Sequence, residues 1–103
     1  MTTDPVSPLL IDRERLAELC RRWKIRELAL FGSVLRDDFG PESDVDVLIE
    51  YEPGTTLGFR VFDLERELSA LFGGRRVDVV PRKYLNRRLR DRVLAEAKVQ
   101  YAA

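Results

Sequence analysis

An apolar residue recurs every three or four positions in three stretches of the chain, a spacing typical of helices with one buried face. The first stretch follows Asp12, a good N-cap, and ends near Lys24. The second covers 57–72 and is followed by two glycines, which end helices. The third follows Asn86, a second N-cap. The residues expected to face the core are Leu16, Leu19, Cys20 and Trp23, then Val61, Leu64, Leu68 and Leu71, then Leu89, Val93 and Ala97.

Shorter apolar runs between these helices are typical of strands. At 25–31, Leu28 and Leu30 fall on one face, and Ala29 and Phe31 fall on the other, so both faces of this strand should be covered. The remaining predicted segments are a short helix at 33–36, a turn-rich stretch at 37–43, strands at 45–51 and 76–80, and a short terminal strand at 99–101.

The resulting order is helix, strand, short helix, strand, helix, strand, helix. It predicts an α/β fold in which a small mixed sheet is flanked by helices. A chain of 103 residues is the right length for a single domain over 1–103, with no room for a separate substrate domain. We expect residues 1–7 to be flexible.

Charge and residue usage narrow the classes of function. Eighteen basic and 18 acidic residues balance, so the chain has no overall positive field and strong nucleic-acid binding is not expected. The sequence contains no histidine, which excludes histidine-based catalytic triads and histidine-ligated zinc. Carboxylates therefore have to carry any catalytic chemistry.

Two features predict a cytoplasmic protein with no membrane partner. Cys20 is the only cysteine and lies in a helical apolar pattern, so there is no disulfide framework and a reducing compartment is expected. Residues 1–7 lack the features of a signal peptide, and no apolar run approaches the roughly 20 residues of a membrane span.

Asp44 and Asp46 stand two positions apart at the start of a predicted strand. Because side chains alternate along a strand, both carboxylates should project from the same face. Two such close carboxylates repel each other unless a cation lies between them, and their hard oxygen ligands suit Mg²⁺ bound to phosphate. The pair therefore predicts a metal site. Glu50 and Glu52 alternate in the same way, but we expect them to form a solvated face.

Asp78 is an isolated acid in the apolar strand at 76–80. A charge that faced the core would be penalised by several kcal/mol, so Asp78 should face the same cation site. If the two strands are neighbours, three acids converge. This is the arrangement that holds two metal ions about 4 Å apart and activates an attacking oxygen.

Gly32 and Ser33 follow the strand at 25–31, at the start of a short helix. Such a turn presents backbone N–H groups and a hydroxyl to an anion, and glycine permits close approach of the backbone. A triphosphate would bind there. Arg36 is either a further phosphate ligand or a surface residue, since its guanidinium suits phosphate oxygens but the helix geometry is not fixed by the sequence.

The combination of Gly32-Ser33, ten intervening residues, Asp44-Val45-Asp46 and the later strand acid Asp78 resembles the signature of the minimal nucleotidyltransferase (MNT) family. Its members are the antitoxin halves of HEPN/MNT toxin–antitoxin pairs and belong to the DNA polymerase beta superfamily. The similarity covers nearly the whole chain. Many relatives follow the Gly-Ser pair with Ala-Arg-Gly, whereas this chain has Leu-Arg-Asp and keeps the arginine, Arg36.

The resemblance implies a polymerase beta-like nucleotidyltransferase fold and assigns roles to the quoted residues. Gly32 and Ser33 would hold the triphosphate, Asp44 and Asp46 would bind Mg²⁺, and Asp78 would be the third ligand and a candidate base. It also implies the transfer of a nucleoside monophosphate, AMP from ATP in some relatives, to a tyrosine hydroxyl of a partner HEPN toxin.

Two alternatives stay open: a binding antitoxin that keeps the fold without catalysis, and an enzyme that modifies a small molecule such as an aminoglycoside. The sequence does not identify the nucleotide, the acceptor or the oligomeric state, a homo-oligomer included. Eight arginine and lysine residues between 75 and 92 form either a solvated face or a surface for a partner or phosphate.

Overall fold

A computed structural model of the chain describes residues 11–35, 40 and 43–103. The segment expected to be flexible, 1–7, and the candidate phosphate ligand Arg36 lie outside these residues. The elements in chain order, with η for 3-10 turns, are α1 (Arg13–Arg22), β1 (Ile25–Phe31), η1 (Gly32–Leu35), β2 (Val45–Tyr51), η2 (Gly58–Arg60), α2 (Val61–Leu71), β3 (Val77–Pro81), η3 (Arg82–Tyr84), α3 (Arg87–Glu96) and β4 (Lys98–Ala102).

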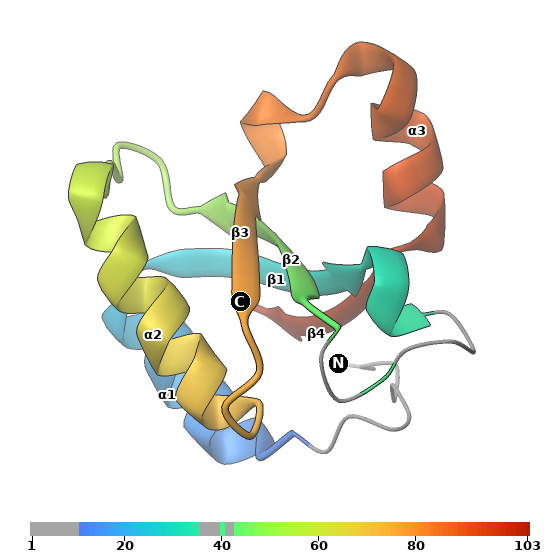
Figure 1. The fold of residues 1–103 in the computed structure, drawn as a ribbon. Helices are drawn as coiled ribbons and strands as arrows, with labels where there is room; N and C mark the ends of the chain where they lie inside the picture. The colour runs from blue at the N-terminus through green and yellow to red at the C-terminus, as the bar shows by residue number, and fades with distance from the viewer. Residues whose placement is uncertain (1–10, 36–39, 41–42) are drawn as a thin grey trace.

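The strands form one sheet in the order β3-β2-β1-β4 (Figure 1). β1 pairs antiparallel with both β2 and β4, whereas β2 and β3 run parallel. Parallel neighbours need a crossover connection, and α2 forms it between β2 and β3. The predicted α/β fold with a small mixed sheet is confirmed.

Helices α1 and α2 cover one face of the sheet, and the core lies between them and the strands (Figure 1). Alternation along β2 places Val45, Val47 and Ile49 in this core, where each side chain is fully buried. The helical spacing predicted the other half of the core, whose buried members are Leu16, Leu19, Cys20, Trp23, Leu64, Leu68 and Leu71.

Local side-chain chemistry sets the ends of the helices as expected. The Asp12 carboxylate accepts hydrogen bonds from two backbone N–H groups in the first turn of α1, and the Asn86 side chain accepts one at the start of α3. After α2, Gly73 adopts a φ of +77°, a left-handed conformation that glycine reaches without steric cost. No helix in the described ranges has the length and apolar character needed to cross a membrane.

Several boundaries differ from the predicted ones, most of them by a single residue, and two of the differences have a clear physical cause. α2 begins at Val61 rather than at 57, because Gly58 has a left-handed φ of +56° and the chain first makes the 3-10 turn η2. β3 extends to Pro81, which was expected to end the strand before it. An edge strand tolerates proline, because the N–H group that proline lacks would point away from the sheet.

The last helix, α3, lies on the other side of the sheet from α1 and α2 (Figure 1). Val93 is half-buried, while the side chain of Leu89 lies outside the described part of the chain. The prediction that Ala97 faces inward from this helix was wrong, because α3 ends at Glu96 and Ala97 is its C-cap, with an extended ψ of 141° that leads into β4.

Candidate functional site

Strands β2 and β3 place Asp46 and Asp78 side by side. The two acids are register partners in the parallel pair, whose backbones run about 4.8 Å apart. The valines on either side of each acid are buried in the core, so alternation directs both acids to the opposite face of the sheet. Asp78 is exposed and Asp46 is half-buried. The two strands are therefore neighbours, which is the condition that the sequence analysis set for the acids to converge.

Gly32 lies directly against Asp46. Its φ is +74°, and a Cβ atom built on it would collide with the Asp46 carboxylate oxygen Oδ2 and lie 3.2 Å from Cγ. A side chain at this position would therefore displace the carboxylate as well as strain the backbone. The turn that the sequence predicts for phosphate binding and one predicted metal ligand occupy the same corner of the molecule.

Asp44 lies just before β2, and its carboxylate oxygen Oδ1 is 3.9 Å from Nε of Arg76. The backbone N–H of Val45 donates to the Arg76 carbonyl over 2.8 Å, which fixes this segment beside the start of β3. Sequence analysis did not identify Arg76 as part of the site. Its position two residues before Asp78 was the available signal.

The three acids offer hard oxygen donors at one end of two neighbouring strands, a ligand type that suits a divalent cation. With the side chains arranged as they are, the described residues contain no group of three acidic or thiol side chains gathered closely enough to hold an ion. Asp44 turns toward Arg76 instead, as expected for carboxylates that would otherwise repel one another. Metal binding by all three residues stays a prediction.

Ser33 follows Gly32 within η1, which continues directly from β1. Its backbone therefore lies at the predicted phosphate turn, but its side chain is outside the described part of the structure, as is the whole of Arg36. Their predicted contacts with a nucleotide stay predictions.

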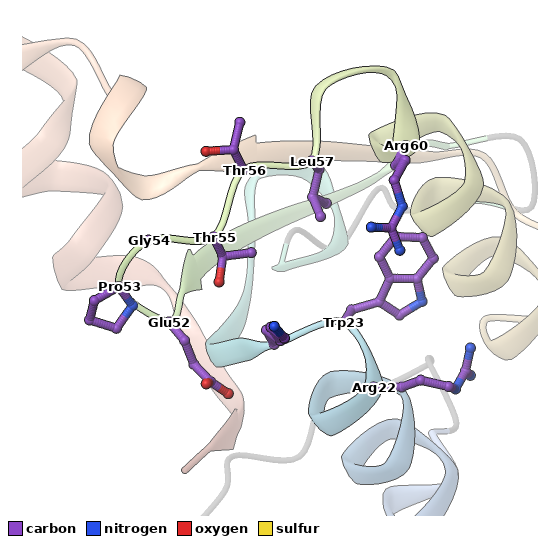
Figure 2. A pocket seen from close by; sticks show the side chains of 10 residues that line it. Arg22, Trp23, Glu52, Pro53, Gly54, Thr55, Thr56, Leu57 and Arg60 are labelled. Carbon is purple, nitrogen blue, oxygen red and sulfur yellow. The ribbon is translucent and has the colours of Figure 1, made fainter.

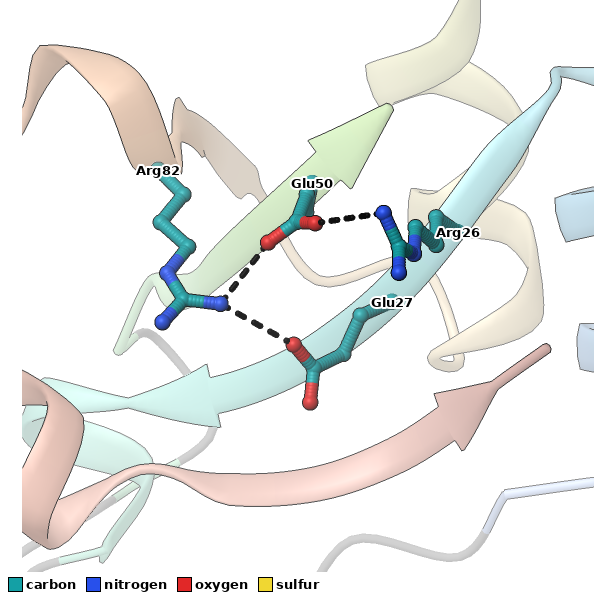
Figure 3. A network of polar contacts seen from close by, with 4 residues as sticks. All are labelled: Arg26, Glu27, Glu50 and Arg82. Atoms are coloured by element: carbon teal, nitrogen blue, oxygen red, sulfur yellow. Dashed lines mark hydrogen bonds and ion pairs between the residues drawn. The ribbon is translucent and has the colours of Figure 1, made fainter. Parts of the chain in front are cut away.

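A polar network occupies the same face of the sheet, further along β2 (Figure 3). Glu50 and Glu27 are register partners on β2 and β1, and Nη1 of Arg82 lies 2.7 Å from Oε2 of Glu50 and 3.5 Å from Oε2 of Glu27. Arg26 lies 3.6 Å from Glu50 on the other side. Glu50 is thus half-buried and paired, rather than part of the solvated face that the sequence suggested. These ion pairs of Arg82 hold the start of η3 against the sheet.

A hollow of about 320 Å³ lies away from the three acids, between the end of α1 and the loop 52–57 (Figure 2). The guanidinium of Arg60 stacks over the Trp23 ring at 5.1 Å from its centroid. The indole N–H of Trp23 donates to Glu67 over 2.9 Å. None of the three acids lines this hollow, so the candidate chemistry belongs to the end of β2 and β3 at which Asp46 and Asp78 lie.

A comparison with protein-family models matches residues 13–100 to the nucleotidyltransferase domain. The matched range includes the phosphate turn at Gly32 and all three acids.

Known proteins with related sequences or structures agree with this match. The protein adenylyltransferase MntA of Thermococcus cleftensis is 33% identical over 96 residues, which cover 93% of each chain. A solved structure assigned as a minimal nucleotidyltransferase is 40% identical, with a TM-score of 0.68 over 82% of this chain and 85% of that one. A solved complex of a tri-AMPylated HEPN toxin from Shewanella oneidensis with an MNT antitoxin is 20% identical, has a TM-score of 0.60 over 88% of this chain and 70% of that one, and shares the fold.

Proposed function

This chain belongs to the nucleotidyltransferase domain family, and we propose that it transfers AMP from ATP to a hydroxyl of a partner HEPN toxin and so acts as the antitoxin. The observation that carries the proposal is the contact of Gly32 with Asp46, beside Asp78 on the neighbouring strand. It joins a phosphate-binding turn to carboxylates that suit a cation. The relative from Thermococcus cleftensis is a protein adenylyltransferase, which supports a protein acceptor.

Members of this family use divalent metal ions. We infer that the ion here is Mg²⁺, that two ions bind, and that Asp44, Asp46 and Asp78 hold them. Bound Mg²⁺ would neutralise the charge of the triphosphate and lower the pKa of an attacking hydroxyl. Asp44 would have to turn from Arg76, and this costs little because the 3.9 Å ion pair is largely exposed to solvent.

The residues of the chain have distinct parts in the reaction. The backbone at Gly32 and Ser33 binds the triphosphate, and Arg36 adds a contact to its oxygens. Asp78 is exposed, so an acceptor hydroxyl can reach it and give up its proton to the carboxylate. The acceptor oxygen then bonds to the α-phosphorus, the bond from this phosphorus to the bridging oxygen breaks, and pyrophosphate leaves with that electron pair.

We infer that a second protein brings the acceptor. Asp78 lies on the edge strand β3, on a face where the described residues provide no further domain to enclose an acceptor. An open site admits water and does not orient a hydroxyl for attack. We place this reaction in the cytoplasm, where ATP is available and where a lone buried thiol such as Cys20 stays reduced.

The deciding experiment combines the chain with ATP labelled on the α-phosphate, Mg²⁺ and a HEPN-family protein encoded beside it. We expect the label on a hydroxyl of that protein, none after chelation of the metal, and none with Asp46→Asn. The variant should keep its fold and its melting temperature, because it removes one of two repelling carboxylates. Full transfer by Asp46→Asn would refute the assignment of the site.

The same reactions separate the two alternatives. A non-catalytic antitoxin would neutralise the toxin without attaching label, and the Asp46→Asn variant would neutralise it equally well. A small-molecule enzyme would transfer label to an aminoglycoside when the chain is alone.

A further inference from the structure

Three large apolar side chains are strongly exposed near the far end of β3. Phe59 is 90% exposed, Phe62 is 59% exposed and Tyr84 is 71% exposed. They come from η2, from the first turn of α2 and from η3, the elements on either side of the end of β3 (Figure 1). Strongly exposed aromatic side chains mark sites of interaction with other proteins. Tyr84 lines the hollow described next, and Phe62 follows directly after Val61, which also lines it.

A hollow of about 340 Å³ lies between these elements. Its apolar lining comes from Leu57 and Val61 on one side and from Val79, Pro81 and Tyr84 on the other. The described residues that line it include one cation, Lys83, and no acid. The groove, as we call this hollow, is therefore apolar with a positive rim.

The edge of β3 beside the groove is closed to an added strand. In a parallel pair alternate residues point their backbone groups outward, and on β3 these are Val77, Val79 and Pro81. The Val79 N–H already donates to Oε2 of Glu65 over 3.0 Å, and Pro81 has no N–H. A partner thus cannot extend the sheet here and has to insert side chains into the groove.

We propose that the groove docks an amphipathic helix of the partner toxin, with apolar side chains in the hollow and an acidic residue beside Lys83. This inference rests on the proposed function for the identity of the partner. The charge of the rim favours an acidic occupant. A second copy of this chain offers no such helix among its described elements, because α1 and α2 bury their apolar faces in the core and α3 is rich in arginine.

The groove and the catalytic acids are connected through β3. Val79 lines the groove and follows directly after Asp78, whose side chain points to the other face of the sheet. From Asp78 to Pro81 the strand rises about 10 Å. A toxin anchored at the groove can therefore hold a hydroxyl at the acids while the anchor itself stays outside the catalytic site.

The test measures binding of the HEPN-family protein by calorimetry for two variants at exposed positions. One is the double variant Phe62→Ser with Tyr84→Ser, and the other is Lys83→Glu. We expect the double variant to raise Kd at least about tenfold and Lys83→Glu to raise it several-fold, while ATP affinity stays unchanged. Lys98→Glu is the matched control, since it makes the same charge change on β4 at the opposite edge of the sheet. The Asp46→Asn variant should bind the toxin normally and transfer nothing.

Every other outcome overturns the docking proposal, and the outcomes differ in whether the proposed function stands. If the toxin binds wild type and groove variants alike and transfer persists, the proposed function stands and the groove is not the docking site. If the toxin does not bind wild type at all, the proposed function fails, and sedimentation then tests for a second copy. If the wild-type chain self-associates and the groove variants do not, the occupant is a second copy of the chain. If neither the wild-type chain nor the variants self-associate, the groove has no role in binding.

Discussion

Gly32 is the residue through which the phosphate-binding turn contacts the Asp46 carboxylate. Replacing it with alanine should have two effects, because its φ is +74° and because the added methyl group meets the Asp46 carboxylate. The left-handed backbone costs about 1 kcal/mol of folding stability with a Cβ atom present. Displacement of Asp46 should lower the rate of nucleotide transfer about a hundredfold. Denaturation and initial-rate measurements check the two effects.

Gly73→Ala is a matched control for this variant. Gly73 has nearly the same φ, +77°, but a Cβ atom there would meet nothing within 4 Å. It should lose a similar amount of stability and keep full transfer activity. Equal activity losses in both variants would mean that Gly32 matters only through the stability of the fold.

Cys20 should make the fold sensitive to alkaline conditions. Burial raises the pKa of its thiol from the usual 9.0 to about 12, an effect that the charge of Arg21 partly offsets. Burial and the charge of Glu65 likewise raise the pKa of Tyr51 from 10.0 to about 12. Since the folded state holds these protons more tightly, their stabilising contribution is complete below pH 9.0 and is lost as the pH rises toward 12.

Chemical denaturation at a series of pH values between 7 and about 11 measures this loss. The native thiol should also resist a thiol reagent near neutral pH and react only on unfolding. Cys20→Ala should flatten the decline above pH 9.0, leaving the part due to Tyr51. An unchanged decline in Cys20→Ala would show that the thiol does not titrate with folding.

The start of η3 is attached to the sheet through Arg82. Glu27 and Glu50 face each other across β1 and β2, and like charges in this position destabilise a strand pair unless a cation separates them. One nitrogen of Arg82 contacts both (Figure 3). Arg82→Ala should therefore cost about 1 kcal/mol of stability, measured by urea denaturation.

The double variant Arg82→Ala with Glu27→Gln tests the cause. Removing one carboxylate relieves the repulsion that Arg82 normally screens, so the second change should recover much of the lost stability. Additive losses would indicate that Arg82 stabilises the protein through packing of its aliphatic stem rather than through its charge.

The strands next to the site were predictable because their apolar runs are bounded by clear breakers. β1 and β2 begin and end at the predicted residues, 25–31 and 45–51. The start of α2 was not predictable from periodicity, since Leu57 fits the helical spacing while Gly58 adopts a left-handed φ that no helix contains. Pro81 was misplaced because its effect depends on whether a strand lies at an edge, which sequence spacing does not state.

The acids of the site were predictable, and their surroundings were not. Alternation and the apolar neighbours of Asp46 and Asp78 placed both on one face, and the register of β2 and β3 then aligned them. The pairings Arg76–Asp44 and Arg82–Glu50 join residues 32 positions apart along the chain. Such contacts depend on strand order and register, which local patterns do not encode.

The molecule as a whole has a formal net charge of zero, but its acidic and basic residues are distributed unevenly along the chain. The acids of the site lie at the start of β2 and β3, whereas α3 and the turn before it carry a concentration of arginine on the other side of the sheet from α1 and α2 (Figure 1). Arg87, Arg88 and Arg90 are exposed. A positive helix beyond the catalytic face would attract an acidic partner over a distance, while the apolar groove at β3 would hold it once it arrives.

Reversing the charge of Arg87, Arg88 and Arg90 to glutamate should accordingly weaken both the complex with the toxin and its modification. Interactions between exposed charges are screened beyond a Debye length of roughly 10 Å at 0.1 M salt, so the defect should be large at low salt and small at high salt. It should also appear mainly in the association rate, because exposed charges steer an encounter more than they hold a complex together. Stopped-flow association at several salt concentrations measures both.

A triple reversal at Arg15, Arg66 and Lys98 changes the net charge equally from other exposed positions and serves as the control. If it slows association as much as the α3 variant, only the total charge of the molecule matters. If the α3 variant binds at the wild-type rate, the toxin approaches from elsewhere. A third result is specific to two cooperating surfaces: the α3 variant loses association rate with little change in dissociation, whereas the Phe62→Ser and Tyr84→Ser variant dissociates faster and associates normally. Together these would show that α3 steers the toxin toward the acids and that the groove retains it there.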